Sequence, residues 1–478
     1  TKTFLLHSRP GSSKVIYLDF KGHITKGSYW NTDRRGVTIV TPAFDLDGKP
    51  GTFNYAEHAS IQKIWKEVSD AYAVFDVDVT TQDPGVENIR RTSVGDTNYG
   101  VRVCLGGKVS YLPNWQEIVT SPDDLFGITP EIGCFNKQVT QVAYANDAPV
   151  LVFTDMLYQR GSAKDIADTT VHELGHAFGL SHSTLSDGTE YYSGHNDWAP
   201  YMGDTMGKSV GQWTSGDYDA LATNKEDELS IISSYIPYVG DDHGDTFNLA
   251  TDLIVTKVKS TVRSAIPVYL YTSSATGLIN SRTDKDIFKI TVGEGEFYIE
   301  AAAADPQPNL NIQIKLFDSN GTEVVNADPL GYPYEEEDGM NDTFHHYALP
   351  AGTYYIQVDG VGAYWDAGTS SFYNETADYP ADSSIDSSST PDPVTGLYSI
   401  VDNQYAAFTD YASIGRYTIK TTSWGTPDNL PPVASTTGTT QVGGMAPSTV
   451  KFVGSNSYDT DGIITNYLWD FGDGTNST

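Results

Sequence analysis

Cysteine, basic side chains and long apolar runs are all scarce in this chain. Only two cysteines, Cys104 and Cys134, occur in 478 residues, and neither has a second cysteine three positions away. This spacing argues against a zinc thiolate site and against a thioredoxin-like redox motif. A disulfide between the two is expected for a protein of an oxidising exterior, and two free thiols are the alternative.

Basic residues are outnumbered by acidic ones. There are 29 Lys and Arg against 62 Asp and Glu, which gives a formal net charge of −33. Such a charge repels nucleic acid and anionic membranes and favours cations and neutral or cationic partners. No apolar run reaches the roughly 18 residues that suggest a membrane span. The chain starts at Thr1 without a charged and apolar leader, so we expect any targeting segment to have been removed. Together these features predict a secreted, extracellular protein with no nucleic-acid or membrane partner.

The first half of the chain alternates between strand and helix signals. Residues 55–75 have the 3.6-residue period of an amphipathic helix, and residues 163–179 predict a second helix with acidic residues near its start. The strand candidates are residues 13–20, 76–82, 100–105, 141–145 and 148–155. This order predicts an α/β domain over residues 1–238, with a twisted and mostly parallel sheet and long helices.

Only strand signals recur beyond residue 239. Segments such as DIFKITV, EFYIEAAA, NIQIKLFD, GTYYIQVDG and GRYTIK are separated by Gly, Asn, Asp and Pro. They predict an antiparallel β-sandwich over residues 239–421. Residues 422–432 are rich in proline and predict a stiff linker. Residues 433–478 predict a further, partial β-domain.

Three of the ten histidines lie in the stretch TTVHELGHAFGLSH. His172 and His176 are four positions apart, so a helix presents both rings on one face. Gly179 is able to take a left-handed conformation that ends the helix and turns the chain, which brings His182 to a third position. Three imidazole ligands leave one open position on a tetrahedral zinc ion, as in catalytic sites. The alternative is that these are ordinary core or surface histidines of an amphipathic helix.

The string HELGHAFGLSH resembles the metzincin zinc proteases, because it matches their signature HExxHxxGxxH at every fixed position. The resemblance implies a zinc ion held by His172, His176 and His182. It also implies that Glu173 is the general base, which takes a proton from water and passes it to the leaving amine. A site that binds zinc without activity is the weaker alternative.

The metzincin resemblance also implies a methionine turn beneath the imidazoles. Met202 in APYMGDTMG is the first candidate and Met206 the second, and the alternative is that either only fills a gap in the core. Asp204 stands where the astacin and serralysin branches have tyrosine, so the closer resemblance is to reprolysin-like bacterial secreted members. The family further implies a specificity pocket walled by roughly residues 203–218. The strand order places residues 141–145 as an antiparallel edge that holds an extended peptide.

Two downstream segments resemble known modules. DDHGDTFNLATDL, followed by DKDIFKITV and AGTYYIQVDG, resembles the bacterial pre-peptidase C-terminal domain, a small β-sandwich appended to secreted proteases. YDTDGIITNYLWDFGDGT resembles the first half of a PKD domain, with Trp469 as a core residue. Acidic residues of the first module are candidate calcium ligands, or else a solvated acidic face. They are Asp241, Asp242, Asp245, Asp284 and Asp286.

The sequence as a whole predicts a secreted zinc endopeptidase. We expect a monomer that hydrolyses internal bonds of protein or peptide substrates, insoluble protein included, with calcium as a structural ion. The alternative from another class is an extracellular matrix-binding or adhesive protein in which the zinc site is structural. A metal hydrolase that acts on something other than peptide is a third reading.

Overall fold

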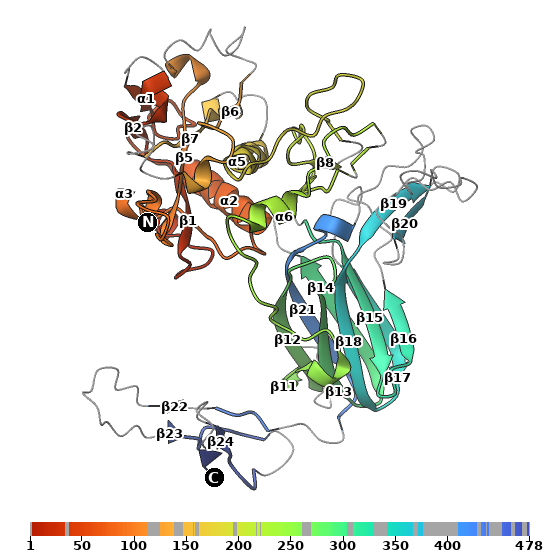
Figure 1. The fold of residues 1–478 in the computed structure, drawn as a ribbon. Coiled ribbons are helices and arrows are strands. Elements are labelled where there is room, and N and C mark those ends of the chain that lie inside the picture. Colours follow the sequence, from red (N-terminus) through yellow and green to blue (C-terminus); the bar gives the residue numbers. More distant parts are fainter. Residues whose placement is uncertain are drawn as a thin grey trace.

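The computed structural model contains an α/β region, a β-sandwich and short strands near the C-terminus (Figure 1). The residues that it describes are 2–33, 38–112, 125–137, 147–155, 157, 162–194, 198–216, 218–219, 221–260, 269–303, 309–327, 342–366, 371–375, 410–427, 432–435, 437–438, 452–459, 464–470 and 476–477.

The α/β region is built on one five-stranded sheet of order β4-β1-β5-β7-β6. Its strands are β1 (Lys14–Asp19), β4 (Asp78–Thr80), β5 (Tyr99–Leu105), β6 (Gly127–Ile128) and β7 (Val150–Val152). Strand β1 is parallel to both β4 and β5, and β5 is parallel to β7, whereas β6 is antiparallel to β7. All residues of β5 and β7 are buried, as expected for strands covered on both faces. The prediction of a mostly parallel sheet is confirmed.

The antiparallel edge of this sheet is β6, a strand that the sequence did not predict. The predicted edge strand, residues 141–145, lies outside the described residues. Strand β6 has only two residues, which is too short for an alternating pattern to be seen in the sequence. A Cβ added at Gly127 would lie 2.6 Å from Cγ of Glu173, so glycine is what allows this edge to approach the helix so closely.

Two capped helices cover the sheet. Helix α2 (Tyr55–Ala71) begins with a capping box between Asn54 and Glu57, and helix α5 (Ala163–Ala177) begins with one between Ser162 and its third residue, Asp165. Their apolar faces enter one core cluster with the sheet strands. The sequence predicted the first helix to extend to residue 75, but α2 ends at Ala71. Residues 72–75 are apolar because they are buried in turns that follow the helix.

A buried carboxylate lies between the two helices. Glu67 of α2 is 8% exposed, and neither carboxylate oxygen has a hydrogen-bond partner among the described residues. Its charged neighbours are Lys63 and Asp70 on α2, and Lys164 and Asp168 on α5. Burial is the main cause that raises the pKa of Glu67 to about 8.

Replacement of Glu67 by glutamine is expected to stabilise the protein at alkaline pH. The folded state holds this proton up to about pH 8, whereas an unfolded glutamate loses it near pH 4.5, so the free energy of unfolding falls between these values as the pH rises. Glu67→Gln removes that loss, and we expect a gain on the order of 1–3 kcal/mol near pH 8. Urea unfolding from about pH 5 to 8 measures the effect, with the exposed Glu87→Gln as control. Equal pH slopes in wild type and Glu67→Gln would contradict the prediction.

The predicted disulfide is wrong, because both cysteines are free and buried. Cys104 on β5 belongs to an apolar cluster with Trp30 and Leu151, whereas Cys134 packs in the main core cluster with Val103. Successive side chains of a strand point to opposite faces, so Cys104 points away from the face that Val103 shares with Cys134. The sheet therefore separates the two thiols.

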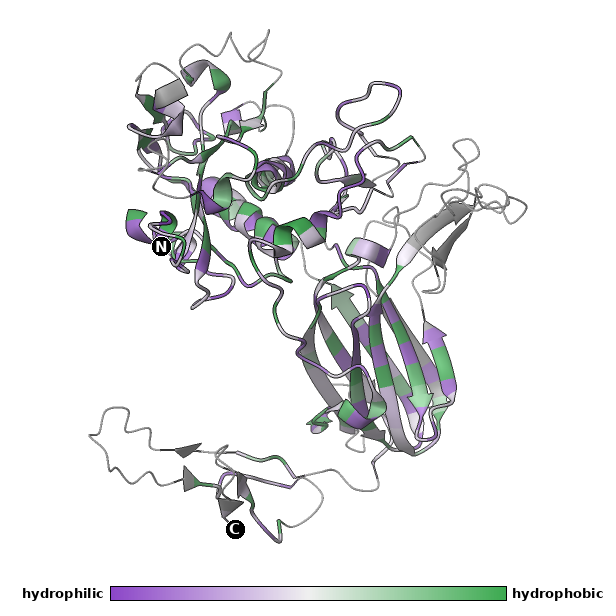
Figure 2. Ribbon diagram, in the orientation of Figure 1, coloured by the Kyte–Doolittle hydropathy of each residue, from purple (hydrophilic) through white to green (hydrophobic). Residues whose placement is uncertain are grey.

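The β-sandwich consists of two five-stranded sheets of order β10-β13-β18-β15-β16 and β11-β12-β21-β14-β17. All its strand pairs are antiparallel except β10 with β13. Buried and less buried residues alternate along β21, and along β13 from Phe288 onward, and Figure 2 shows bands of opposite hydropathy on strands of the sandwich. The predicted antiparallel sandwich is confirmed. Its strands are β10 (Thr251–Asp252), β11 (Thr256–Lys259), β12 (Tyr269–Ile279), β13 (Lys285–Val292), β14 (Gly295–Ala303), β15 (Ile312–Asp318), β16 (Glu323–Ala327), β17 (Asp342–Leu349), β18 (Gly352–Gly360) and β21 (Gly415–Ser423).

The remaining elements are short. The helices are α1 (Tyr29–Asp33), α3 (Val86–Ile89) and α6 (Glu228–Ser233). Two-stranded pairs are formed by β2 (His23–Thr25) with β3 (Ile39–Thr41), β8 (Trp198–Pro200) with β9 (Val210–Gln212), β19 (Gly362–Asp366) with β20 (Ser371–Glu375), β22 (Thr437–Gly438) with β23 (Phe452–Val453), and β24 (Trp469–Asp470) with β25 (Asn476–Ser477). Trp469, on β24, is only half-buried.

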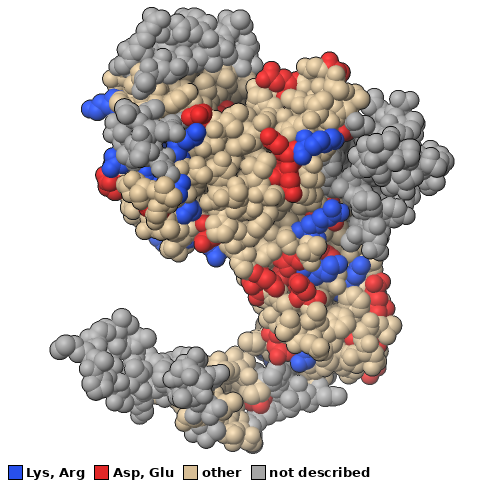
Figure 3. Space-filling model, viewed as in Figure 1, with Lys and Arg blue, Asp and Glu red and all other residues tan. Residues whose placement is uncertain are grey.

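Charged side chains of both signs are interspersed on the face seen in Figure 3. None of the helices in the described parts of the chain combines the length and the apolar character that crossing a bilayer requires.

Candidate metal centre

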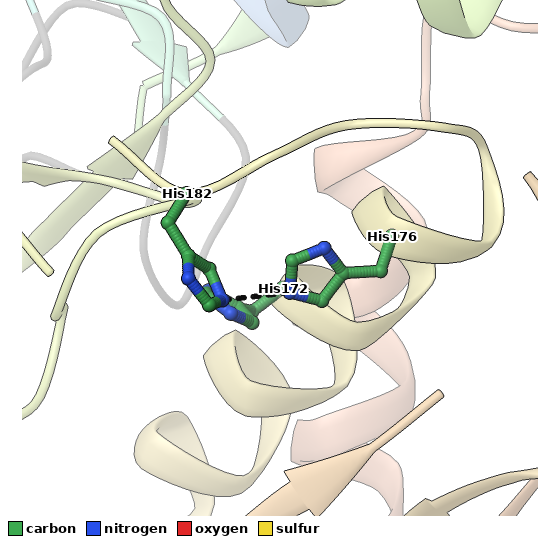
Figure 4. Close-up of side chains that lie close together, drawn as sticks. All are labelled: His172, His176 and His182. Carbon is green, nitrogen blue, oxygen red and sulfur yellow. Dashed lines mark hydrogen bonds between the residues drawn. The ribbon is translucent and has the colours of Figure 1, made fainter. Parts of the chain in front are cut away.

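Helix α5 and the turn after it bring three imidazoles together. His172 and His176 lie one turn apart on α5, with ring centroids 4.8 Å apart. Gly179 has a φ of 103°, so the helix ends there and the chain turns back, as predicted. The ring of His182 then lies 4.7 Å from that of His176 and 5.3 Å from that of His172, centroid to centroid (Figure 4). One ligand nitrogen from each ring lies within 4.8 Å of the others.

Hydrogen bonds that the Nδ1 atoms donate to nearby oxygens orient these rings. Nδ1 of His172 lies 2.7 Å from the carbonyl oxygen of Tyr201, and Nδ1 of His176 lies 2.8 Å from that of Leu180. A carbonyl oxygen only accepts, so Nδ1 carries the proton in both rings and Nε2 carries a lone pair. Nδ1 of His182 is 3.3 Å from a carboxylate oxygen of Glu190, which favours the same tautomer.

The Nε2 lone pairs are the feature that fits a cation. Nε2 of His176 and Nε2 of His182 are 3.0 Å apart, and two bare nitrogens at this distance repel unless a positive charge lies between them. Burial is the main cause that lowers the pKa of His172 to about 3 and of His176 to about 4, so both rings are neutral and able to act as ligands. Neutral imidazoles whose Nδ1–H groups donate hydrogen bonds, and whose Nε2 atoms are left to bind a metal, are typical zinc ligands.

Glu173 faces the same space. Its side chain is 7% exposed, and the Thr129 hydroxyl lies 2.8 Å from its Oε2 and 2.6 Å from its backbone oxygen. Burial raises the pKa of Glu173 to about 8. The carboxylate is thus held between the helix and the edge strand β6, beside the imidazoles rather than among the three grouped nitrogens.

Met202 lies directly beneath the histidine helix. It is fully buried, and a Cβ added at Gly175 would lie 2.4 Å from its sulfur atom. Gly175 is therefore what lets Met202 approach α5 between His172 and His176. Met206, the alternative, is only partly buried and lines the cavity.

A cavity of about 620 Å³ lies over α5 and contains the three histidines and Glu173. Of the predicted wall, residues 203–218, only residues 203–206 line it; Tyr218 packs in a separate cluster with Trp198 and Val210. After Met206 the chain runs through β9 away from this cavity, so the rest of the expected wall stays a prediction. Two parts of the lining were not predicted from the sequence: the apolar side chains before and within β6, and Tyr191. The ring of Tyr191 lies 4.1 Å from that of His182, centroid to centroid. No spacing rule connects these residues to the helix, so the sequence pattern gave no sign of them. The lining residues are Leu125, Phe126, Gly127, Ile128, Thr129, Ile132, Asp165, Thr169, His172, Glu173, His176, His182, Tyr191, Gly203, Asp204, Thr205 and Met206.

A second cluster of possible ligands lies in the β-sandwich. Carboxylate oxygens of Asp241, Asp284 and Asp286 lie within 4.8 Å of one another. Asp284 and Asp286 are 5% and 0% exposed, and Oδ1 of each has no hydrogen-bond partner among the described residues. Burial raises the pKa of Asp284 to about 7 and of Asp286 to about 8. Of the other two candidates, Asp242 accepts from the backbone of Leu278 and Asp245 from that of Lys285, and neither belongs to the cluster.

One family model matches the C-terminal end of the chain. Residues 429–478 match the PKD domain family model, which confirms the PKD resemblance of the sequence. No curated protein matches the chain significantly.

Several solved structures are similar at low identity. The pre-peptidase C-terminal domain of a Bacillus anthracis collagenase is 8% identical over 31% of this chain and 86% of its own, with a TM-score of 0.16. A periplasmic inhibitor of g-type lysozyme from Aeromonas hydrophila is 9% identical over 36% and 97%, with a TM-score of 0.16. A carbohydrate-binding module of a Cellvibrio mixtus lichenase, in complex with cellotriose, is 12% identical over 22% and 77%, with a TM-score of 0.10. Scores this low assign no shared fold.

Proposed function

We propose that this protein is a secreted zinc-dependent endopeptidase of the metzincin type. The observation that carries the proposal is the convergence of ligand nitrogens from three imidazoles beside the buried Glu173 in one cavity. The full HExxHxxGxxH string and the buried Met202 beneath it support the family assignment. The PKD match supports an extracellular setting and an association with protein substrates.

His172, His176 and His182 are the residues that would hold the zinc ion. When bound, zinc supplies a Lewis acid that polarises a carbonyl oxygen and lowers the pKa of water. The positive charge of a bound zinc ion would favour the ionised form of Glu173, whose pKa burial raises. The carboxylate would then take a proton from the attacking water and deliver it to the leaving amine. The Thr129 hydroxyl orients Glu173 for this transfer, and Met202 supports the imidazoles from below without reaching the substrate.

The edge strand β6 is the element that would hold a peptide. It pairs with β7 on one side, and its residues Gly127 and Ile128 line the cavity beside Glu173. An extended peptide that adds to this edge places its backbone along the cavity, where the carbonyl to be attacked comes close to the general base. The substrate class is therefore protein or peptide, with the bond cleaved inside the chain rather than at its end. We propose that the enzyme acts as a monomer.

We propose calcium as a second ion, which the sandwich binds as a structural ion. Two buried carboxylate oxygens without partners, on Asp284 and Asp286, lie with Asp241 at the spacing of a shared cation. Calcium binds several carboxylate oxygens at once and satisfies such orphaned acceptors.

Zinc content and chelation test the proposed function. We expect about one zinc per chain by elemental analysis, casein hydrolysis that a chelator abolishes, and recovery on addition of zinc. His182→Ala should lower both zinc content and hydrolysis by at least about tenfold, because two imidazoles remain. His346→Ala, in the sandwich and outside the cavity lining, serves as the control. Absence of zinc from unstripped protein would overturn the proposal, and zinc without hydrolysis would leave a structural zinc site.

A further inference from the structure

The β-sandwich reaches the candidate metal centre through Tyr201. This residue is 5% exposed, and its backbone oxygen accepts the hydrogen bond from Nδ1 of His172. Its phenol group points the other way and donates to Oδ1 of Asn309 at 3.0 Å. Asn309 lies just before β15 of the sandwich. A single residue, Tyr201, therefore links the proposed zinc ligand His172 to the β-sandwich.

Gln212, at the end of β9, makes a second connection beside the first. It is 1% exposed, and its backbone oxygen accepts from the backbone of Tyr201 at 2.8 Å. Its side-chain amide donates to the backbone oxygens of Asn309 and Ala412, both from the sandwich, and accepts from Nε1 of Trp198. Every polar atom of this amide is thus used either to hold β8 and β9 together or to attach them to the sandwich.

The packing around these hydrogen bonds is continuous. Tyr201 lies against Trp213 with ring centroids 4.9 Å apart, and both belong to a core cluster that also includes the sandwich residues Leu310 and Ile312. Buried side chains in such a cluster have little freedom to adjust independently. A displacement of the sandwich relative to β8 and β9 would therefore move Tyr201, and with it the acceptor that orients His172.

A third contact lies elsewhere on the same interface and offers a control. The phenol group of Tyr411 donates to Oδ1 of Asp227 at 2.6 Å and accepts from the backbone of Leu229 at 2.9 Å, at the start of α6. This contact attaches the sandwich to the α/β region, but none of its groups bonds to the three histidines or to Tyr201 among the described residues.

We propose that the β-sandwich is part of the zinc site's support, with Asn309 and Gln212 as positioning residues that act on His172 through Tyr201. This inference rests on the proposed zinc function. The sandwich then does more than carry the enzyme to a substrate, because it holds β8 and β9, and the methionine turn between them, in place against α5. Groups that orient zinc ligands in this way typically contribute 10- to 100-fold to metal affinity.

The test uses the full chain with four substitutions. Tyr201→Phe and Asn309→Leu each remove the same hydrogen bond from opposite ends, and Tyr411→Phe removes an interface hydrogen bond away from the metal centre. The first readout is hydrogen exchange of residues 198–213 in metal-free protein, and the second is zinc affinity by competition with a chromophoric chelator. We expect Tyr201→Phe and Asn309→Leu to speed exchange there and to weaken zinc binding about tenfold. Asn309→Asp keeps an acceptor for the Tyr201 hydroxyl, so we expect it to show the exchange rate and the zinc affinity of the wild type.

Tyr411→Phe separates positioning from general stability. It should lower the urea midpoint while leaving zinc affinity within about twofold of the wild type, since its hydrogen bond leads to α6. Unchanged exchange and zinc affinity in Tyr201→Phe and Asn309→Leu would overturn the inference. A wild type that binds no zinc would instead overturn the proposed function, and the exchange of residues 198–213 would still decide whether the sandwich holds β8 and β9.

Discussion

Glu173→Gln is expected to lower peptide-bond hydrolysis by about 10²- to 10⁴-fold while zinc remains bound. Glutamine has nearly the same shape and still reaches the Thr129 hydroxyl, which lies 2.8 Å from Oε2 in the wild type, but it has no carboxylate to take a proton. The three imidazoles are untouched, because each is oriented by its own Nδ1 acceptor. The measurement is kcat/KM for an internally quenched peptide, together with zinc content by elemental analysis.

Glu131→Gln is the matched control for this substitution. Glu131 pairs with Lys137 at 3.2 Å and does not line the cavity, so the same chemical change there should leave hydrolysis within about twofold. Hydrolysis by Glu173→Gln at the wild-type rate, with zinc still present, would exclude Glu173 as the general base. Loss of zinc along with activity would show that the residue supports the ligands.

Calcium is expected to produce the second large effect, on the stability of the sandwich. At about 100 times its dissociation constant, a ligand that binds only the folded state adds about 2.7 kcal/mol to the free energy of unfolding. Without a cation, Asp284 and Asp286 leave two buried oxygens unsatisfied, so calcium-free protein should melt at a lower temperature. Thermal unfolding at saturating zinc, with and without added calcium, measures this increase, and calorimetric titration gives the stoichiometry.

Asp286→Asn tests the site without changing its shape. The amide can still accept from the Tyr417 hydroxyl, which lies 2.6 Å from Oδ2 of Asp286 in the wild type, but it provides a weaker calcium ligand. We expect the calcium-dependent gain to be lost and the calcium-free variant to be no less stable than the wild type. Asp242→Asn, outside the cluster, should keep the full response. A wild type whose melting temperature does not respond to calcium would exclude the site.

The sequence predicted much of the fold because its signals are local. The period of residues 55–75 and the capping residues before α2 and α5 are properties of neighbouring side chains, and both helices form close to their predicted bounds. The meeting of the histidine rings could also be predicted locally. His172 and His176 are at helical spacing and Gly179 follows them, so no information from the rest of the chain was needed. The alternation along β13 and β21 predicted the sandwich in the same way.

Features that depend on pairing between distant segments were predicted poorly. The two-residue strand β6 has no pattern of its own and is formed by its pairing with β7, at a place where Gly127 lies against Glu173. The disulfide was expected from the cysteine count, but the sheet places Cys104 and Cys134 in separate clusters. Of the residues expected to wall a specificity pocket, roughly 203–218, only residues 203–206 line the cavity, and β9 carries the chain away from it afterwards.

The amino-acid sequence by itself determined which residues are candidates for the chemistry: His172, Glu173 and His176 on one helix, His182 after the turn at Gly179, and a group of acidic residues in the sandwich. It did so because ligand type and helix period are written in neighbouring positions. Only the tertiary structure decided what holds those residues in place, from the carbonyl of Tyr201 at His172 to the contact of Asn309 with Tyr201. These partners are separated by tens to hundreds of residues, and their meeting follows from how sheets and helices pack, which no local pattern specifies.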